Sequence, residues 1–197
     1  MSGDDDRLNV AMIIGSVRDG RVAPLVANWS AAQAERRGDV ALDVIDLAET
    51  RLPDGLRGHF GGEKPEEVTG LQPRVEAADA FVVVTPEYNR SFPAALKLMI
   101  DSYHREWAAK PVGFVCYGGM SSGLRAVEQL RLVFAELHAV TIRDSVAFQS
   151  PWTLFDPEGN WPKDPAGPEG AAKVMLDELV WFGRALREAR AARPYGG

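Results

Sequence analysis

The sequence predicts an α/β protein built on a doubly wound, five-stranded parallel sheet with the strand order 2-1-3-4-5 and helices in layers on both faces. Two observations lead to this prediction. Short, almost wholly apolar runs alternate along the chain with stretches of helical periodicity, and the runs carry few charges, as expected of strands covered on both faces. Because each parallel crossover needs a helix to return the chain, this alternation indicates a sheet between two helical layers.

The first half of the chain supplies two expected strands and one helix. The apolar run 9–14 is the first strand, and a polar turn leads from it into a helix over 23–37, which ends at Gly38. A shorter strand follows at 41–47, where apolar and acidic residues alternate. Residues 52–73 contain five glycines and three prolines without clean periodicity, so they predict a long loop with about one helical turn.

The second half begins with the most apolar run, residues 80–85, which is expected at the centre of the sheet. The remaining elements are expected as a loop at 86–92, a helix at 93–103, a strand at 111–117, an amphipathic helix at 121–137, a strand at 140–148, an aromatic loop at 151–168 and a helix at 171–193. Neither an internal repeat nor a linker divides the chain. We therefore expect one domain over residues 1–197, with residues 1–7 as a disordered tail.

Composition excludes several function classes. The 22 Lys and Arg residues against 28 Asp and Glu give a net charge of −6, which disfavours a nucleic-acid partner. No apolar run approaches the roughly 18 residues of a membrane span. The acidic N-terminal residues differ from a secretory signal, so a cytoplasmic protein is expected. Cys116 is the only cysteine, and the three histidines lie far apart, so no metal site is expected.

Ligands of doubly wound sheets bind beyond the carboxyl ends of the strands, where the winding reverses. The first loop at this edge, residues 15–21, carries Ser16, Arg18 and Arg21 before a helix start, which is a suitable set of donors for an anion. Neither a Walker pattern nor GxGxxG is present, so a monophosphate is favoured over a triphosphate or pyrophosphate. The alternative is a capping serine followed by solvated arginines.

Two further loops share this predicted edge. The second, residues 85–93, is stiffened by two prolines and presents Tyr88 and an amide that could bind the edge of a flat heteroaromatic ring. The third, residues 117–123, contains glycines that allow close approach of a ligand to the backbone. Alternatively, the second loop is an ordinary strand-to-helix connection and the third a common glycine-rich helix start.

Together the three loops resemble the NADPH-dependent FMN reductase family of flavodoxin-like flavoproteins. The resemblance covers roughly residues 9–150, and the Pro-Glu-Tyr-Asn segment after the central strand is its most specific part. The matching segments are Gly15-Ser-Val-Arg-Asp-Gly-Arg21, Pro86-Glu-Tyr-Asn-Arg-Ser-Phe-Pro93 with Leu96, Lys97 and Asp101, and Tyr117-Gly118-Gly119 with Gly123-Leu-Arg-Ala126, Gln129 and Leu130.

This resemblance implies bound FMN and hydride transfer from NADPH or NADH through the flavin to a small acceptor such as free flavin, a quinone or an azo compound. Its implied cofactor contacts are Ser16, Arg18 and Arg21 on the phosphate, Pro86, Glu87, Tyr88 and Asn89 along the isoalloxazine ring, and Tyr117, Gly118, Gly119 and Ser122 at the other ring edge. No side chain is expected to act as a catalytic residue, because the flavin carries the chemistry. A homodimer or homotetramer is also implied.

Two other classes remain open for the same fold. One is a flavodoxin-type electron carrier without its own NAD(P)H turnover, although its usual Ser/Thr-rich phosphate loop differs from the two arginines here. The other is a binding module that has lost the flavin. The aromatic loop is open to two interpretations as well: an exposed contact surface, or a loop folded over its own core.

Overall fold

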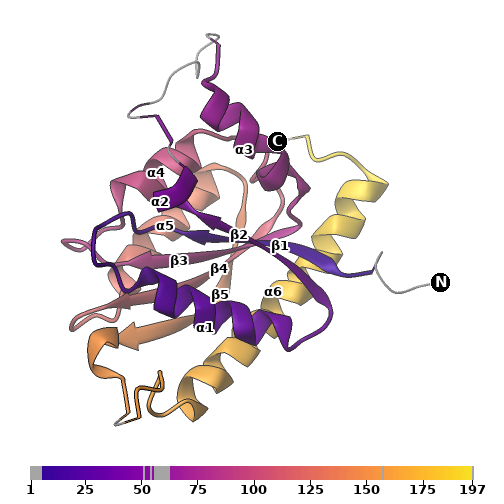
Figure 1. Ribbon diagram of the computed structural model, residues 1–197. Coiled ribbons are helices and arrows are strands. Elements are labelled where there is room, and N and C mark those ends of the chain that lie inside the picture. The colour runs from indigo at the N-terminus through magenta and orange to yellow at the C-terminus, as the bar shows by residue number, and fades with distance from the viewer. Residues whose placement is uncertain (1–5, 51, 54, 56–62, 157, 197) are drawn as a thin grey trace.

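The computed structural model describes residues 6–50, 52–53, 55, 63–156 and 158–196. A parallel sheet with the order β2-β1-β3-β4-β5 forms its centre, which confirms the predicted fold class and strand order (Figure 1). Each neighbouring pair of strands is parallel. The strands are β1 (Leu8–Ile14), β2 (Val40–Asp46), β3 (Ala80–Pro86), β4 (Pro111–Gly118) and β5 (Val140–Gln149).

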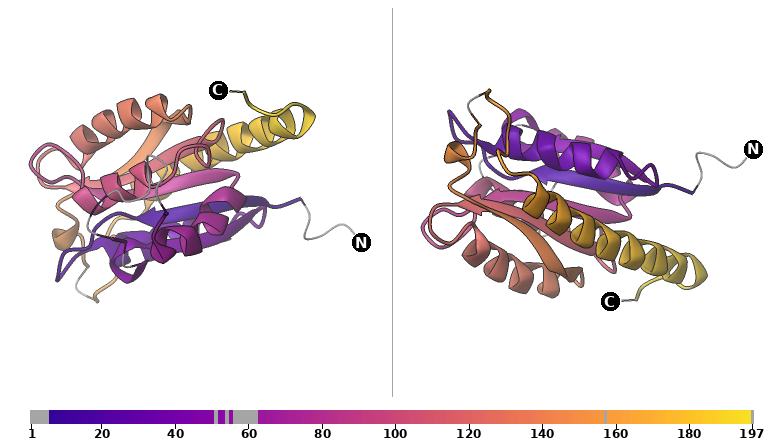
Figure 2. Two further views of the ribbon diagram at one scale, coloured as in Figure 1. Left: turned by 90° about the horizontal axis from the view of Figure 1, so that it is seen from above. Right: turned by 90° about the horizontal axis from the view of Figure 1, so that it is seen from below.

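Helices cover both faces of this sheet (Figure 2). On one face lie α1 (Ala23–Glu35) and α6 (Ala166–Ala192), and on the other lie α3 (Glu66–Ala77), α4 (Ala94–Asp101) and α5 (Leu124–Glu136). A short helix, α2 (Leu47–Thr50), follows β2. Every residue of β3 and β4 is buried, as expected of central strands between two apolar layers.

The expected long loop at 52–73 is wrong in its second half, because α3 occupies residues 66–77. Val68, Leu71 and Val75 lie on one face of α3, and their side chains are buried against the sheet. Gly70 and Pro73 are poor helix formers within this segment, so its helical periodicity is hard to recognise in the sequence. The crossover from β2 to the parallel strand β3 requires such a helix, so topology overrides local propensity here. Residues 51, 54 and 56–62 of the expected loop lie outside the described residues.

The end of the chain also differs from expectation, because α6 begins at Ala166 and not at Ala171. Gly167 and Pro168 fall in its first turn, where a missing N–H is tolerated. The aromatic loop is correspondingly shorter and includes one 3-10 turn, Pro151–Thr153. Of the predicted tail, residues 1–5 lie outside the described part, while the carbonyl of Arg7 accepts a hydrogen bond from Arg187.

Within the described residues, no helix is both long enough and apolar enough to cross a bilayer. The same part of the chain contains no group of three or more His, Cys, Asp or Glu side chains placed to hold a metal ion.

Candidate functional site

The structure brings the three predicted loops together at the carboxyl edge of the sheet, on the left in Figure 1. The first loop contacts the second through a hydrogen bond of 2.8 Å between the Ser16 and Tyr88 hydroxyls. The second contacts the third because the Glu87 N–H donates to the Tyr117 carbonyl at 3.0 Å. Residues far apart in sequence therefore form one continuous site.

The first loop contains two arginines, of which Arg21 is paired with a carboxylate and Arg18, among the described residues, is not. Arg18 is exposed and makes no hydrogen bond or ion pair with the described residues. Arg21 instead donates to both Asp46 oxygens at 2.6 and 2.7 Å and to the Ser16 carbonyl at 2.9 Å. The Asp46 hydrogen bonds raise the pKa of Arg21 above its ordinary value. Arg18 thus carries the uncompensated positive charge of this loop.

The second loop is a tight turn whose tip points away from the core. Tyr88 and Ser91 exchange two backbone hydrogen bonds of 2.9 Å, and Asn89 and Arg90 between them have φ values of 50° and 70°. Positive φ at both central residues is the signature of a type I′ turn. The Gln129 amide of α5 donates to the Arg90 carbonyl at 2.6 Å, and the Ser91 hydroxyl donates to Gln129 Oε1. The loop is therefore held rigidly in place.

Glu87 is turned toward α5 and fixes the second loop against the third. Its side chain is only 8% exposed, and its Oε2 accepts from the Arg125 N–H at 3.2 Å. A carboxylate at this position satisfies a free N–H and interacts favourably with the helix dipole. An ion pair of 3.4 Å with the Arg125 guanidinium adds to this contact.

The third loop depends on Gly123, whose φ is 92°. A Cβ built there would lie 2.6 Å from the Tyr117 nitrogen and 2.8 Å from the Cys116 Cβ, so no larger residue fits without a shift of α5. Gly119, in contrast, is exposed and open on its side-chain face. Ser122 is half-buried with a φ of 56°. The close approach at Gly123 thus sets the path of a loop in which Gly118 is buried and Gly119 is accessible.

Tyr117 carries an unsatisfied hydroxyl beside the first two loops. The residue is 5% exposed, and its hydroxyl is buried with no hydrogen-bond partner in the described part of the chain. Burial raises the pKa of this hydroxyl, an effect that the neighbouring Ser16 and the charges of Arg18 and Arg21 partly oppose. Ser16 itself pairs with Tyr88. Leaving a buried hydroxyl unpaired costs about 1–3 kcal/mol. The Tyr117 hydroxyl can therefore gain a partner in a ligand that lies beside the paired hydroxyls of Ser16 and Tyr88.

The aromatic loop divides into a packed and an exposed part. Trp161 packs on Phe148 with a centroid distance of 4.7 Å, Phe148 packs on Trp29 at 5.1 Å, and the Trp161 indole donates to the Pro151 carbonyl. Trp152 and Phe155 remain 55% and 46% exposed. The Ser150 N–H donates to the Gly118 carbonyl at 2.6 Å, which places the start of this loop beside the third loop. The packing of Trp161 agrees with a loop folded over its own core, while a contact role for the exposed Trp152 and Phe155 stays a prediction.

Asp46 was not among the residues expected at the site. In sequence it looked like one of the alternating polar residues of a strand, although its place at the carboxyl end of β2 is the signal that could have identified it. Asp46 and Arg21 are 25 residues apart in the sequence, so their ion pair can be recognised only in the three-dimensional structure.

Several known proteins have similar sequences. An NAD(P)H-dependent FMN reductase of Schizosaccharomyces pombe is 32% identical over 119 residues, which are 58% of this chain and 60% of that protein. An FMN-dependent NADPH-azoreductase of Staphylococcus haemolyticus is 26% identical over 179 residues, 87% of this chain and 93% of that protein. The chain thus spans less than two-thirds of the fission-yeast relative.

The fold also matches solved structures. The flavoenzyme NAD(P)H:(acceptor) oxidoreductase FerB of Paracoccus denitrificans has a TM-score of 0.73 at 23% identity, over 90% of this chain and 98% of that one. Residues 8–153 match the family described as NADPH-dependent FMN reductase, and these residues include all three loops. This match extends over most of the chain, which therefore belongs to the NADPH-dependent FMN reductase family.

Proposed function

We propose that the protein binds FMN at the three loops and transfers hydride from NAD(P)H to a small-molecule acceptor. The observation that carries this proposal is the buried Tyr117 hydroxyl, which has no hydrogen-bond partner among the described residues and lies beside the Ser16–Tyr88 pair and the free cation of Arg18. A phosphate is rich in acceptor oxygens and negatively charged, so it fits both features. FMN would supply the hydride chemistry through its flavin ring.

The proposed contacts follow from where the structure places each residue. Ser16 and Arg18 bind the phosphate, and Tyr88 and Tyr117 supply hydroxyls at the same corner. Pro86, Asn89 and the backbone of Glu87 line one side of the ring, while Gly118, Gly119 and Ser122 line the other. Arg21 and the Glu87 carboxylate act on this site through the groups that they hold, because both are already paired. None of these groups is needed as a nucleophile or general base.

The acceptor is proposed to be a quinone or an azo compound. Support comes from the azoreductase among the relatives and from the acceptor oxidoreductase among the structural neighbours. We propose either NADPH or NADH as the hydride donor. Exposed glycine backbone at Gly119 leaves space for a planar ring to approach.

The test is steady-state turnover by the purified protein with added FMN. We expect NADPH oxidation that requires both FMN and a quinone or azo acceptor. Bound flavin without turnover above the uncatalysed rate would instead favour an electron carrier. Failure to bind FMN at all would reject the proposed cofactor and leave a flavin-free binding module.

We further propose that the chain forms a homodimer or homotetramer in the cytoplasm. Val174 and Trp181 on α6 are 51% and 66% exposed, and such apolar side chains suit a contact between subunits. Cys116 is buried in β4 and unpaired, which suits a reducing compartment. Size-exclusion chromatography with light scattering tests the oligomeric state, and a monomeric mass would contradict the proposed oligomer. Fractionation of the source cells tests the proposed location.

A further inference from the structure

We infer that Asp46 is a positioning residue for the phosphate site, acting through Arg21 and the peptide bond after Ser16. This inference rests on the proposed binding of FMN. Asp46 would orient a backbone donor of the first loop without touching the cofactor. Arg21, which the sequence placed on the phosphate, would then serve as the connection between this carboxylate and the loop.

The contact between Asp46 and Arg21 is bidentate and largely buried. The two bonds measure 2.6 and 2.7 Å, and the side chains are 13% and 16% exposed. Paired bonds between a guanidinium and a carboxylate fix the relative orientation of both groups. The Arg21 side chain therefore has a defined place between β2 and the first loop.

Asp46 is itself firmly held. It lies opposite Ile14 in the parallel pairing of β1 and β2, so it sits at the level where the first loop begins. Its Oδ1 also accepts from the Ala48 N–H at 3.0 Å, and its carbonyl accepts from the Thr50 hydroxyl at 2.6 Å. One carboxylate thereby joins the sheet, the start of α2 and the first loop.

The effect on the loop runs through the Ser16 carbonyl, which accepts from Arg21 at 2.9 Å. In a trans peptide the carbonyl and the following N–H point in opposite directions. Holding the Ser16 carbonyl on Arg21 therefore directs the Val17 N–H away from Arg21. This N–H donates to no other group among the described residues, and Val17 is 46% exposed. It is thus a free backbone donor in the loop that also contains Ser16 and Arg18.

The alternative is that Asp46 only neutralises the charge of Arg21. A carboxylate near a phosphate would then weaken binding, and its removal would free a second cation for the ligand. The two interpretations predict opposite changes in FMN affinity when Asp46 loses its charge. A measurement of FMN affinity in an Asp46 variant therefore distinguishes the two interpretations.

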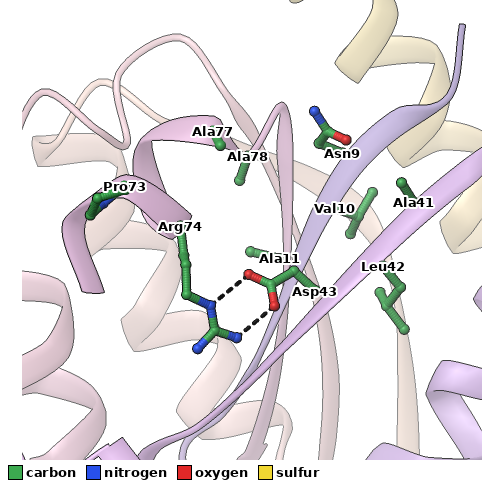
Figure 3. Close-up of a pocket in the computed structure, with 10 residues that line it drawn as sticks. All are labelled: Asn9, Val10, Ala11, Ala41, Leu42, Asp43, Pro73, Arg74, Ala77 and Ala78. Atoms are coloured by element: carbon green, nitrogen blue, oxygen red, sulfur yellow. Dashed lines mark hydrogen bonds and ion pairs between the residues drawn. The ribbon is translucent and has the colours of Figure 1, made fainter. Parts of the chain in front are cut away.

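The chain offers a matched control on the same strand. Arg74 of α3 binds both oxygens of Asp43 at 2.8 and 2.5 Å (Figure 3). Arg74 also donates to the Val44 carbonyl at 2.8 Å. This pair makes the same set of hydrogen bonds as the pair of Asp46 and Arg21, including the third bond to a backbone carbonyl, but its side chains are more exposed, at 43% and 47%. It lies beside a hollow of about 350 Å³ lined by parts of β1, β2 and the end of α3, and not at the first loop.

The experiment compares Asp46→Asn with Asp43→Asn. For each variant, dissociation constants are measured for FMN and for riboflavin, which has the same ring without the phosphate. The NMR chemical shift of the Val17 amide is followed in the protein without flavin. We expect Asp46→Asn to weaken FMN binding about tenfold, in line with the loss of one charge-assisted hydrogen bond, and to leave riboflavin binding unchanged. Asp43→Asn should change neither.

In the flavin-free protein, the NMR chemical shift of the Val17 amide should move in Asp46→Asn, because the Ser16 carbonyl is no longer held on Arg21, and it should stay unchanged in Asp43→Asn. Arg21→Lys keeps the charge but loses the bidentate geometry, so it should reproduce the loss of FMN affinity; it also serves if Asp46→Asn fails to fold. Tighter or unchanged FMN binding in Asp46→Asn overturns the inference. If the unaltered protein binds no FMN, the proposed function fails, whereas an unchanged chemical shift of the Val17 amide refutes the role of Asp46 independently.

Discussion

The Tyr117 hydroxyl is unfavourable for the protein alone and useful only with a ligand. Removing it in Tyr117→Phe deletes an unsatisfied buried group, so we expect the flavin-free protein to gain up to about 1 kcal/mol in unfolding free energy. The same change should weaken FMN binding, so that the added stability conferred by FMN shrinks. Urea unfolding with and without FMN measures both effects, and a destabilised flavin-free variant would show that the hydroxyl is already paired.

Arg18 provides a second test at the level of single residues. Its side chain has no partner in the described structure, so Arg18→Ala should leave the unfolding free energy within about 0.5 kcal/mol of the original. FMN affinity should fall about fivefold to tenfold and should depend less on salt, because one charge on the phosphate is lost. Titration of flavin fluorescence at two salt concentrations checks this, and unchanged affinity would remove Arg18 from the site.

Among the secondary-structure elements, α5 depends on its approach to β4 at Gly123. Gly123→Ala places a Cβ within 2.6 Å of the Tyr117 nitrogen at a positive φ, so we expect a loss of about 2–4 kcal/mol in unfolding free energy. Gly119→Ala is the control, because its side-chain direction is open and should leave stability nearly unchanged. Equal stability of the two variants, compared by thermal unfolding, would contradict the close packing seen here.

The edge strand β5 contains a bulge that the helices on both faces hold in place. Between the pairs Val112–Thr141 and Phe114–Ser145, three β5 residues oppose one β4 residue. Arg131 of α5 donates to two carbonyls of the bulge, and the Glu178 carboxylate of α6 accepts from the Arg143 and Asp144 N–H groups at 3.2 and 3.0 Å. Two carbonyls and two N–H groups of the bulge are thus paired from opposite faces of the sheet.

We therefore expect Glu178→Ala to cost about 1–2 kcal/mol, because two N–H groups lose their acceptor. Glu188→Ala is a suitable comparison, since Glu188 is exposed on the same helix and makes no hydrogen bond with the described residues. Denaturant unfolding of both variants gives the difference. Equal midpoints would mean that water satisfies the bulge equally well.

For the molecule as a whole, Lys110 makes stability depend on pH at alkaline values. Burial lowers the pKa of Lys110 to about 8, while its ammonium donates to the Val75 and Glu76 carbonyls at the end of α3. Between pH 8 and about 10.4 the unfolded chain binds more protons at this lysine than the folded one, so its contribution to stability rises with pH.

The buried Cys116 thiol acts in the opposite direction above pH 9, because its pKa is raised to about 12. A comparison of wild type with Lys110→Met isolates the lysine. The difference in unfolding free energy should increase in favour of wild type by on the order of 1–2 kcal/mol from pH 8 to pH 10. A difference that stays constant across this range would show that Lys110 keeps an ordinary pKa.

The sheet and its order could be predicted because fully covered strands leave continuous apolar runs, as in β3 and β4. The helix α3 could not, because Gly70 and Pro73 interrupt its pattern and only the parallel crossover requires it. The residues of the three loops were identifiable from their places after strands. Their division into paired groups such as Arg21 and unpaired ones such as Arg18 and Tyr117 depends on contacts between distant segments, which no local pattern records.

The far end of α6 is joined to the amino edge of the sheet, where Arg187 and Arg190 pair with Asp79 at 3.4 and 3.3 Å. Tyr195 lies beside His138 at this same edge, and β1 also starts there. Both ends of the described chain are thus remote from the three loops (Figure 1). An electrode or bead linked through either end would therefore hold the molecule with the three loops directed into solution.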